Sequence, residues 1–238
     1  MLYVILKIFS YFFNNSIVSS KELSSYIITS ITSFKFSLNS KFCFNCQLNW
    51  KSPVKKSYVG SNPLYFKSNY GTEAASIILL AKESSNHETI KTLSESIAES
   101  IIFGVKDMKI NSLISIVTVP SSKSSIRRRG RDHINFLALE VVKKIASRNL
   151  AVEYFPILIA KKNIRDQSKL NSSQRSENTK GNFGVIGCEF PQGAIFLIDD
   201  LVTTGSSMLE AVRALSEAKM TVTALVSACA VGRNSLIP

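Results

Sequence analysis

The sequence contains few cysteines, and their spacing gives little support for disulfides or for a structural metal site. Four cysteines among 238 residues are far too few for a disulfide-stabilised scaffold. Cys43 and Cys46 form one Cys-x-x-Cys pair, whereas a structural zinc ion needs four ligands, typically from two such pairs. No second pair follows, neither histidine lies nearby, and Cys188 and Cys229 come much later in the chain. We therefore expect neither a disulfide scaffold nor a zinc site.

The N-terminal segment lacks an apolar run long enough to cross a membrane. Residues 1–13 are apolar, but Lys7 interrupts them and the run is too short to span a bilayer unaided. A signal peptide would start with a charged region and end at a small-residue cleavage site, whereas polar residues 14–16 follow here. We expect a cytoplasmic protein without stable membrane insertion. A peripheral contact of this segment with a membrane is the alternative.

Acidic residues are scarce relative to basic ones. Seventeen Asp and Glu residues stand against 29 Lys and Arg residues, which gives a net charge of +12 and a pI near 9.6. This balance favours anionic partners, namely phosphorylated small molecules, nucleic acid or a membrane surface, without choosing among them. A solvated basic surface without a partner is the alternative.

From residue 64 onward, apolar residues recur with helical and strand spacing in alternation. This order predicts an α/β domain over residues 64–238 with a mostly parallel sheet flanked by helices. Residues 1–63 are expected to form an N-terminal extension that ends in an irregular segment, 41–63. The predicted helices span 2–13, 22–34, 74–82, 89–103, 134–146 and the residues after 207; the predicted strands span 64–70 (a short strand or hairpin), 113–119, 154–159, 183–186, 194–198 and 221–229; the predicted loops span 121–132 and 161–182.

Residues 194–218 carry the strongest chemical signal. A buried strand is predicted over 194–198, two adjacent carboxylates follow at Asp199 and Asp200, and a small-residue turn precedes an amphipathic helix. The turn and the helix N-terminus offer hydroxyl and backbone N–H donors to a phosphate, and glycine lets the backbone approach it closely. The carboxylates suit a polyol or a hydrated metal, because they only accept hydrogen bonds or ligate hard cations.

A ribose 5-phosphate carries both a phosphate and a diol. The carboxyl end of a strand, where this turn lies, is also where ligands bind in open α/β sheets. The alternative is a simple capped turn, in which Ser206 or Ser207 only caps the helix.

Residues 198–207, Ile-Asp-Asp-Leu-Val-Thr-Thr-Gly-Ser-Ser, resemble the signature with which type I phosphoribosyltransferases bind 5-phosphoribosyl-1-pyrophosphate (PRPP). The resemblance implies the Rossmann-like fold of that family. It implies that Asp199 and Asp200 are catalytic and contact the ribose hydroxyls, and that Mg²⁺ binds with PRPP rather than in a cage of protein ligands. It also implies a 5-phosphate site formed by Leu201, Val202, Thr203, Thr204, Gly205, Ser206 and Ser207.

A second resemblance, to the ComF/GntX family, rests on several blocks that occur in the same order. The basic block 127–131 follows Val119-Pro120 and precedes a block with Gln167, Leu170, Arg175 and Asn178, and then the PRPP signature. The match extends over about residues 41–232, although only Cys43 and Cys46 are left of that family's four-cysteine zinc motif. In type I phosphoribosyltransferases the loop after the first core strand binds the pyrophosphate, and the resemblance to them implies a pyrophosphate site at Ser121, Ser122, Lys123, Arg127 and Arg129. The long polar loop 161–182, which carries Arg165, Gln167 and Arg175, is expected to form a lid.

Both basic features have simpler alternatives. The block 127–131 also fits a solvated loop or a nucleic-acid contact. A histidine in the charged flank of a helix start, such as His133, is more typical of a surface or supporting group than of a catalyst.

The resemblance leaves two main classes of function open. The first is an enzyme that transfers phosphoribosyl from PRPP to an unknown nitrogen acceptor and releases pyrophosphate. The second is a non-catalytic accessory protein that binds PRPP or a nucleotide during DNA uptake (competence) or DNA metabolism, with single-stranded DNA or a helicase as partner, although no nucleic-acid motif occurs. A degenerate relative that binds nothing is a third, weaker hypothesis, and a homodimer is compatible with each.

Overall fold

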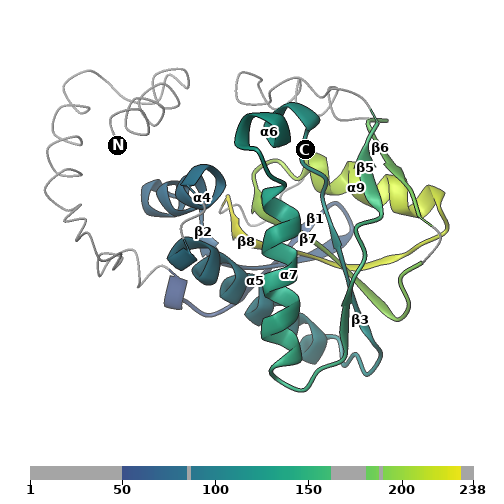
Figure 1. Cartoon of the computed structure of the whole chain (residues 1–238). Coiled ribbons are helices and arrows are strands. Elements are labelled where there is room, and N and C mark those ends of the chain that lie inside the picture. The colour runs from purple at the N-terminus through teal and green to yellow at the C-terminus, as the bar shows by residue number, and fades with distance from the viewer. Residues whose placement is uncertain (1–49, 85–86, 162–180, 188–189, 232–238) are drawn as a thin grey trace, which may run out of the picture.

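A six-stranded sheet with helices on both faces forms the centre of the protein, and a separate two-stranded sheet lies beside it (Figure 1). This computed structural model describes residues 50–84, 87–161, 181–187 and 190–231. The elements in chain order are β1 (Lys55–Val59), β2 (Asn62–Asn69), α4 (Thr72–Ser84), α5 (His87–Asp107), β3 (Ile114–Thr118), α6 (Lys123–Arg129), α7 (His133–Ala146), β4 (Val152–Tyr154), β5 (Leu158–Ala160), β6 (Phe183–Val185), β7 (Ala194–Val202), α9 (Ser206–Glu217) and β8 (Val222–Ala230).

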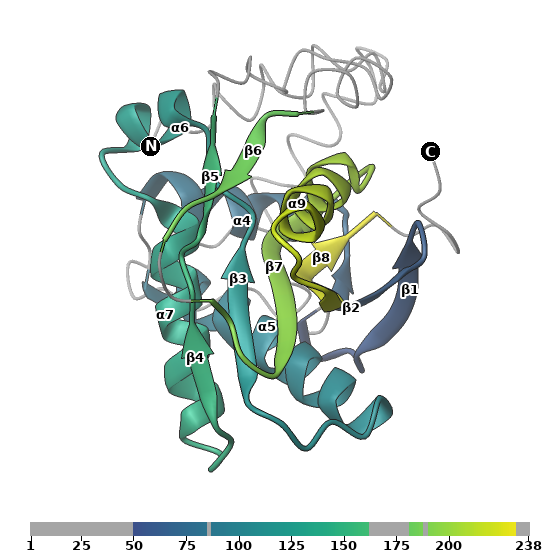
Figure 2. The same ribbon diagram turned by 90° about the vertical axis from the view of Figure 1, so that its right-hand side faces the viewer.

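The strands of the large sheet follow the order β1-β2-β8-β7-β3-β4, which Figure 2 shows side by side. Every neighbouring pair is parallel except β1 and β2, which form an antiparallel hairpin. The predicted α/β class with a mostly parallel sheet flanked by helices is therefore confirmed. Because β3 and β7 are parallel neighbours, the segments that follow them begin at the same edge of the sheet.

The central strands are buried on both faces, as expected for parallel strands covered by helices. On β7, Phe196 and Ile198 belong to the core cluster that α5 and α7 cover. Ile195 and Leu197, which alternate with them, belong to the cluster that α9 covers. In Figure 2, α9 lies in front of the sheet and α5 behind it.

Three predicted segments differ from the structure in more than the position of an end. The predicted loop 121–132 contains the helix α6, which has no buried residue and so leaves no apolar pattern in the sequence. Its N-cap is Ser122, whose hydroxyl accepts a hydrogen bond from the Ser125 N–H at 3.1 Å, and its C-cap is Gly130, which has a φ of +70°.

The predicted strand 154–159 is two short strands in different sheets. β4 pairs with β3, whereas β5 pairs antiparallel with β6. Pro156 lies between them and has no N–H to donate, so the ladder beside β3 ends there.

The third difference concerns the segment 41–63, for which the sequence predicts an irregular structure. Residues Lys55–Val59 form β1 and pair with β2, and they bury Ser57 and Val59 while Lys56 and Tyr58 are exposed. β1 thus belongs to the same sheet as the later strands. Residues 1–49 lie outside the described part of the chain, as do the two helices predicted there, so the domain boundary at residue 63 stays a prediction. Among the described helices, none is both long enough and apolar enough to cross a membrane.

Candidate functional site

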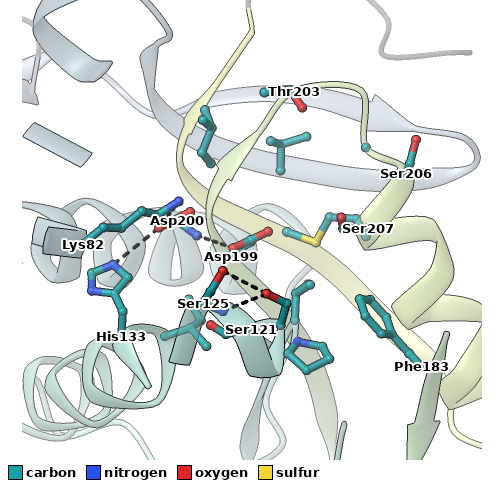
Figure 3. Close-up of a pocket in the computed structure, with 18 of the residues that line it drawn as sticks. Lys82, Ser121, Ser125, His133, Phe183, Asp199, Asp200, Thr203, Ser206 and Ser207 are labelled. Atoms are coloured by element: carbon teal, nitrogen blue, oxygen red, sulfur yellow. Dashed lines mark hydrogen bonds and ion pairs between the residues drawn. The ribbon is translucent and has the colours of Figure 1, made fainter. Parts of the chain in front are cut away.

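A cavity of about 290 Å³ opens where β3 and β7 end. Its walls come from parts of the chain that lie far apart in the sequence. The end of β7 and the turn after it supply residues 199–208, the segment after β3 supplies residues 119–122, and the helix ends supply Lys82 and His133. Figure 3 shows Lys82 and His133 beside Asp200, with Ser206 and Ser207 beyond Asp199 in that view.

The turn between β7 and α9 is built around Gly205. This residue has a φ of +79°, and a Cβ atom placed on it would lie 2.3 Å from Val59 Cγ1. A glycine is therefore required both by the backbone conformation and by the close approach of β1. The same packing fixes the turn against the sheet, so its backbone is held in place before any ligand binds.

Hydroxyl and N–H donors gather on this turn. The Thr204 and Ser206 hydroxyls are 2.9 Å apart, and the Ser206 N–H donates to Thr204 Oγ1 at 3.4 Å. The first hydrogen bond of the helix runs from the Leu209 N–H to the Gly205 carbonyl at 2.9 Å. The N–H groups of Ser207 and Met208 precede it and have no acceptor within the helix. Because Gly205 is the N-cap, Ser206 and Ser207 are the first helical residues and do not cap the helix, which removes the simple capped turn as an explanation.

The two carboxylates lie inside β7 rather than after it, because the strand continues to Val202. Consecutive strand residues point to opposite faces of the sheet, so the side chains of Asp199 and Asp200 lie on different faces. Asp200 is 4% exposed and shares the face of Phe196 and Ile198. Asp199 is partly exposed, and its Oδ1 accepts a hydrogen bond from the Asp200 N–H at 2.9 Å. Both residues line the cavity, but their surroundings differ.

Asp200 has two basic neighbours. Its Oδ2 atom lies 2.8 Å from Lys82 Nζ and 3.4 Å from His133 Nε2. Burial alone would raise the pKa of Asp200, but these neighbours outweigh it and hold the pKa well below its usual range. The opposite holds for Asp199, whose pKa is raised by burial and by the negative charge of Asp200. The site therefore keeps Asp200 ionised and makes Asp199 the carboxyl group that gains or loses a proton more readily near neutral pH.

Only some of the residues predicted to bind pyrophosphate line the cavity. Ser121, Ser122 and Arg129 line the cavity, whereas Lys123 and Arg127 are absent from its described lining. Arg129 also interacts with the end of α4, where its Nε lies 3.4 Å from Glu83 Oε1.

Arg131 belongs to the same basic block and docks on the same helix end. Its Nη2 donates to the carbonyls of Ala81 and Lys82 at 3.0 and 3.1 Å. Part of the basic block therefore fixes the end of α4 next to the cavity.

Sequence reasoning missed Lys82 and Phe183, both of which line the cavity. A lysine in the last turn of an apolar helix is common, so no local pattern distinguishes Lys82. For His133 the sequence predicts a surface or supporting group, and it is a buried residue, 3% exposed, that contacts Asp200. Further predictions lie outside the described residues, namely Cys43, Cys46 and the lid residues Arg165, Gln167 and Arg175.

In the described part of the chain, no group of three or more His, Cys, Asp or Glu side chains is arranged to hold a metal ion. A divalent ion that arrives with a phosphorylated ligand does not need such a group. It typically takes one or two carboxylates from the protein and its other ligands from phosphate and water. The partly exposed carboxylate of Asp199 fits that requirement.

Neither a known protein family nor a curated protein matches the sequence. Among solved structures, the chain is similar to an adenine phosphoribosyltransferase from Trypanosoma brucei, in complex with AMP, pyrophosphate and ribose-5-phosphate. The two chains are 12% identical, the match covers 80% of this chain and 81% of that chain, and the TM-score is 0.37. A likeness of this size does not indicate what this chain binds or catalyses.

Proposed function

We propose that the cavity binds PRPP and that the protein is a phosphoribosyltransferase-like member of the ComF/GntX family with a type I phosphoribosyltransferase fold. In this proposal it transfers phosphoribosyl from PRPP to a nitrogen acceptor and releases pyrophosphate. One observation carries the proposal: a single cavity combines a hydroxyl-rich glycine turn at the start of α9 with the carboxylates of Asp199 and Asp200. These are the groups that a phosphate and a ribose diol require.

The ligand's parts are assigned to the walls by their chemistry. The 5-phosphate is placed on the turn 203–207, where hydroxyls and N–H groups donate. The ribose hydroxyls are placed against Asp199, because a carboxylate accepts hydrogen bonds from a diol. The pyrophosphate is placed near Ser121, Ser122 and Arg129, which supply two hydroxyls and a guanidinium.

Bond breaking at the ribose C1 builds positive charge on the ring and negative charge on the departing pyrophosphate. Asp199 stabilises the positive ring, and Arg129 stabilises the leaving group. Mg²⁺, when bound with PRPP, would supply further charge neutralisation on the pyrophosphate oxygens. Asp199 must be ionised for its part, and its raised pKa makes that part depend on pH.

Calorimetric titration of PRPP into the full chain, with and without Mg²⁺, tests the proposal. Saturable binding is expected in the parent, and Asp199→Asn should weaken it by about 10-fold or more, since hydrogen bonds to a charged group contribute about 1.5–3 kcal/mol. Glu153→Gln is the control, because Glu153 is an exposed carboxylate on β4. Absence of PRPP binding by the parent would contradict the proposal.

The accessory function can be separated from the enzyme on the same samples. The net charge of +12 makes single-stranded DNA a reasonable ligand, and such binding should fall steeply as salt rises. Turnover of PRPP with a nitrogen base that Asp199→Asn abolishes would support the enzyme. Salt-sensitive DNA binding together with PRPP binding but no turnover across a panel of bases would favour the accessory protein.

A further inference from the structure

Lys82 is a lysine at the end of an apolar helix, yet its surroundings differ from those of a solvated surface lysine. Ala74, Ile77, Ile78 and Ala81 bury the preceding turns of α4 in the core. The Lys82 side chain is 25% exposed and lines the cavity, with its ammonium 2.8 Å from Asp200 Oδ2. The helix therefore delivers one positive charge to the cavity wall.

The end of α4 is fixed from outside the helix. Arg131 donates to the carbonyls of Ala81 and Lys82, and Arg128 and Arg129 lie 3.6 and 3.4 Å from Glu83 Oε1. These contacts hold the residues on both sides of the Lys82 side chain. Its position beside the cavity is thus determined by several partners, so it does not depend on a flexible stem alone.

The group around Asp200 leaves donors for a ligand. Lys82 and His133 both approach the same oxygen, Oδ2, at 2.8 and 3.4 Å. An ammonium has three N–H donors, and one carboxylate oxygen can use only some of them. The N–H donors of Lys82 that Asp200 does not use therefore belong to a side chain that lines the cavity.

The charges of the cavity show what those donors would meet. Two adjacent carboxylates repel a polyanion, so a pyrophosphate can approach the ribose site only if a positive charge offsets them. Arg129 provides one such charge and reaches the end of α4 through Glu83. Lys82 provides a second charge, directly at Asp200.

We infer that Lys82 contacts the pyrophosphate of the ligand, and that Asp200 and His133 are positioning residues that hold its ammonium at the cavity wall. The inference rests on the proposed function. It adds a ligand-contacting residue from α4 and gives the two carboxylates different tasks: Asp199 meets the ribose, whereas Asp200 acts through Lys82.

The test compares two ligands that differ in the pyrophosphate alone. PRPP and ribose 5-phosphate are titrated by calorimetry into the parent chain, Lys82→Met and Lys106→Met. Lys106 is the matched control, an exposed lysine in the last turn of α5. Lys82→Met should weaken PRPP binding by about 10- to 100-fold, the range for a hydrogen bond to a charged group, and ribose 5-phosphate binding by less than about threefold. Lys106→Met should change neither.

A double-mutant cycle tests the positioning role. His133→Gln should weaken PRPP binding by about 3- to 10-fold in the parent and should have little further effect in Lys82→Met, because the histidine acts through the lysine. Equal effects of His133→Gln in both backgrounds would show a general structural role and would overturn this part of the inference.

The remaining outcomes are also decisive. If Lys82→Met does not fold because Asp200 is left underpaired, the double variant Lys82→Met/Asp200→Asn removes both charges and should show the same selective loss of PRPP affinity. Unchanged PRPP affinity in Lys82→Met or in Lys82→Met/Asp200→Asn, or an equal loss for both ligands, overturns the inference while the proposed function stands. A parent chain that binds neither ligand overturns both.

Discussion

Replacing Gly205 with alanine is the sharpest test of how the turn before α9 is built. The substitution adds one methyl group to a residue whose φ is +79°, a conformation that L-residues other than glycine rarely adopt. The added carbon would lie 2.3 Å from Val59 Cγ1, well inside the 3.5–4.0 Å at which carbon atoms pack. Val59 is fully buried at the end of β1, so it has no free space into which to move.

Two costs add in this variant. The left-handed backbone costs about 1–2 kcal/mol for a residue with a Cβ. Forcing a methyl group into a packed site costs about 1–3 kcal/mol more. A central value of about 3 kcal/mol lowers the midpoint of thermal unfolding by about 6–12 °C in a chain of this size.

Gly130→Ala separates these two costs. Gly130 has a φ of +70°, but an added Cβ would have nothing within 4 Å, so this control should lose only about 1–2 kcal/mol. A second control removes the obstacle. In Val59→Ala the nearest remaining atom is the Cβ of residue 59, which would lie 3.4 Å from the new carbon, at the close limit of van der Waals contact.

Thermal unfolding by circular dichroism should therefore show that Val59→Ala and Gly205→Ala are not additive. The double variant should be about 1–3 kcal/mol more stable than the sum of the single effects predicts. Equal losses for Gly205→Ala and Gly130→Ala, or strict additivity with Val59→Ala, would refute the packing of β1 against the turn.

Two further substitutions test the frame around the cavity. Glu210 is 5% exposed and accepts a hydrogen bond from the Phe183 N–H at 3.1 Å, so Glu210→Ala should cost about 2 kcal/mol by leaving that N–H unpaired. The control Glu217→Ala removes a 63% exposed partner of Arg213, and its effect on the unfolding midpoint should correspond to less than about 0.5 kcal/mol; equal losses would contradict the role of Glu210. Ser122→Ala removes the N-cap of α6 and should cost about 1 kcal/mol, and chemical denaturation that shows no loss would contradict the cap.

The sequence predicts elements whose residues bury a continuous or periodic apolar face. β3 and β8 are apolar runs because both of their faces are covered, and α5 shows Leu93, Ile97 and Ile101 at helical spacing on its buried side. β1 and α6 lack such a signal. β1 has only five residues, and just one of its two buried residues, Val59, is apolar. α6 buries no residue, so both elements depend on partners elsewhere in the chain.

The candidate site likewise contains some residues that the sequence predicts and others that only the fold brings together. The turn 203–207 could be found from sequence because its chemistry is local, consisting of hydroxyls, a glycine and a helix start in one run. The contacts of Asp200 with Lys82 and His133 could not be found, because the folding of α4 and α7 against β7 brings them together. The same contacts explain why β7 runs past its predicted end at Ile198. Aspartate disfavours strands, but here Asp199 pairs with Ser227 in β8, and Asp200 finds basic neighbours.

The division of the acidic pair predicts opposite effects of two similar substitutions on stability. The folded protein raises the pKa of Asp199, so it binds more protons than the unfolded chain, and stability falls as the pH rises from the ordinary carboxyl pKa toward the raised one. Asp199→Asn removes that loss and should stabilise the ligand-free protein at neutral pH and above, which raises its unfolding midpoint.

The pKa of Asp200 is lowered, so its contribution is present above the ordinary carboxyl pKa and is lost as the pH falls through the lowered one. Asp200→Asn should therefore destabilise the protein by about 3 kcal/mol at neutral pH, because it leaves Lys82 and His133 without their carboxylate. In the Asp200→Asn background the gain from Asp199→Asn should shrink, since the neighbouring negative charge is gone. Unfolding midpoints of the four proteins between pH 5 and 9 measure all three effects. A destabilising Asp199→Asn would show that this carboxylate is held in place by favourable contacts, and the assignment of Asp199 to the ligand and Asp200 to the fold would then be wrong.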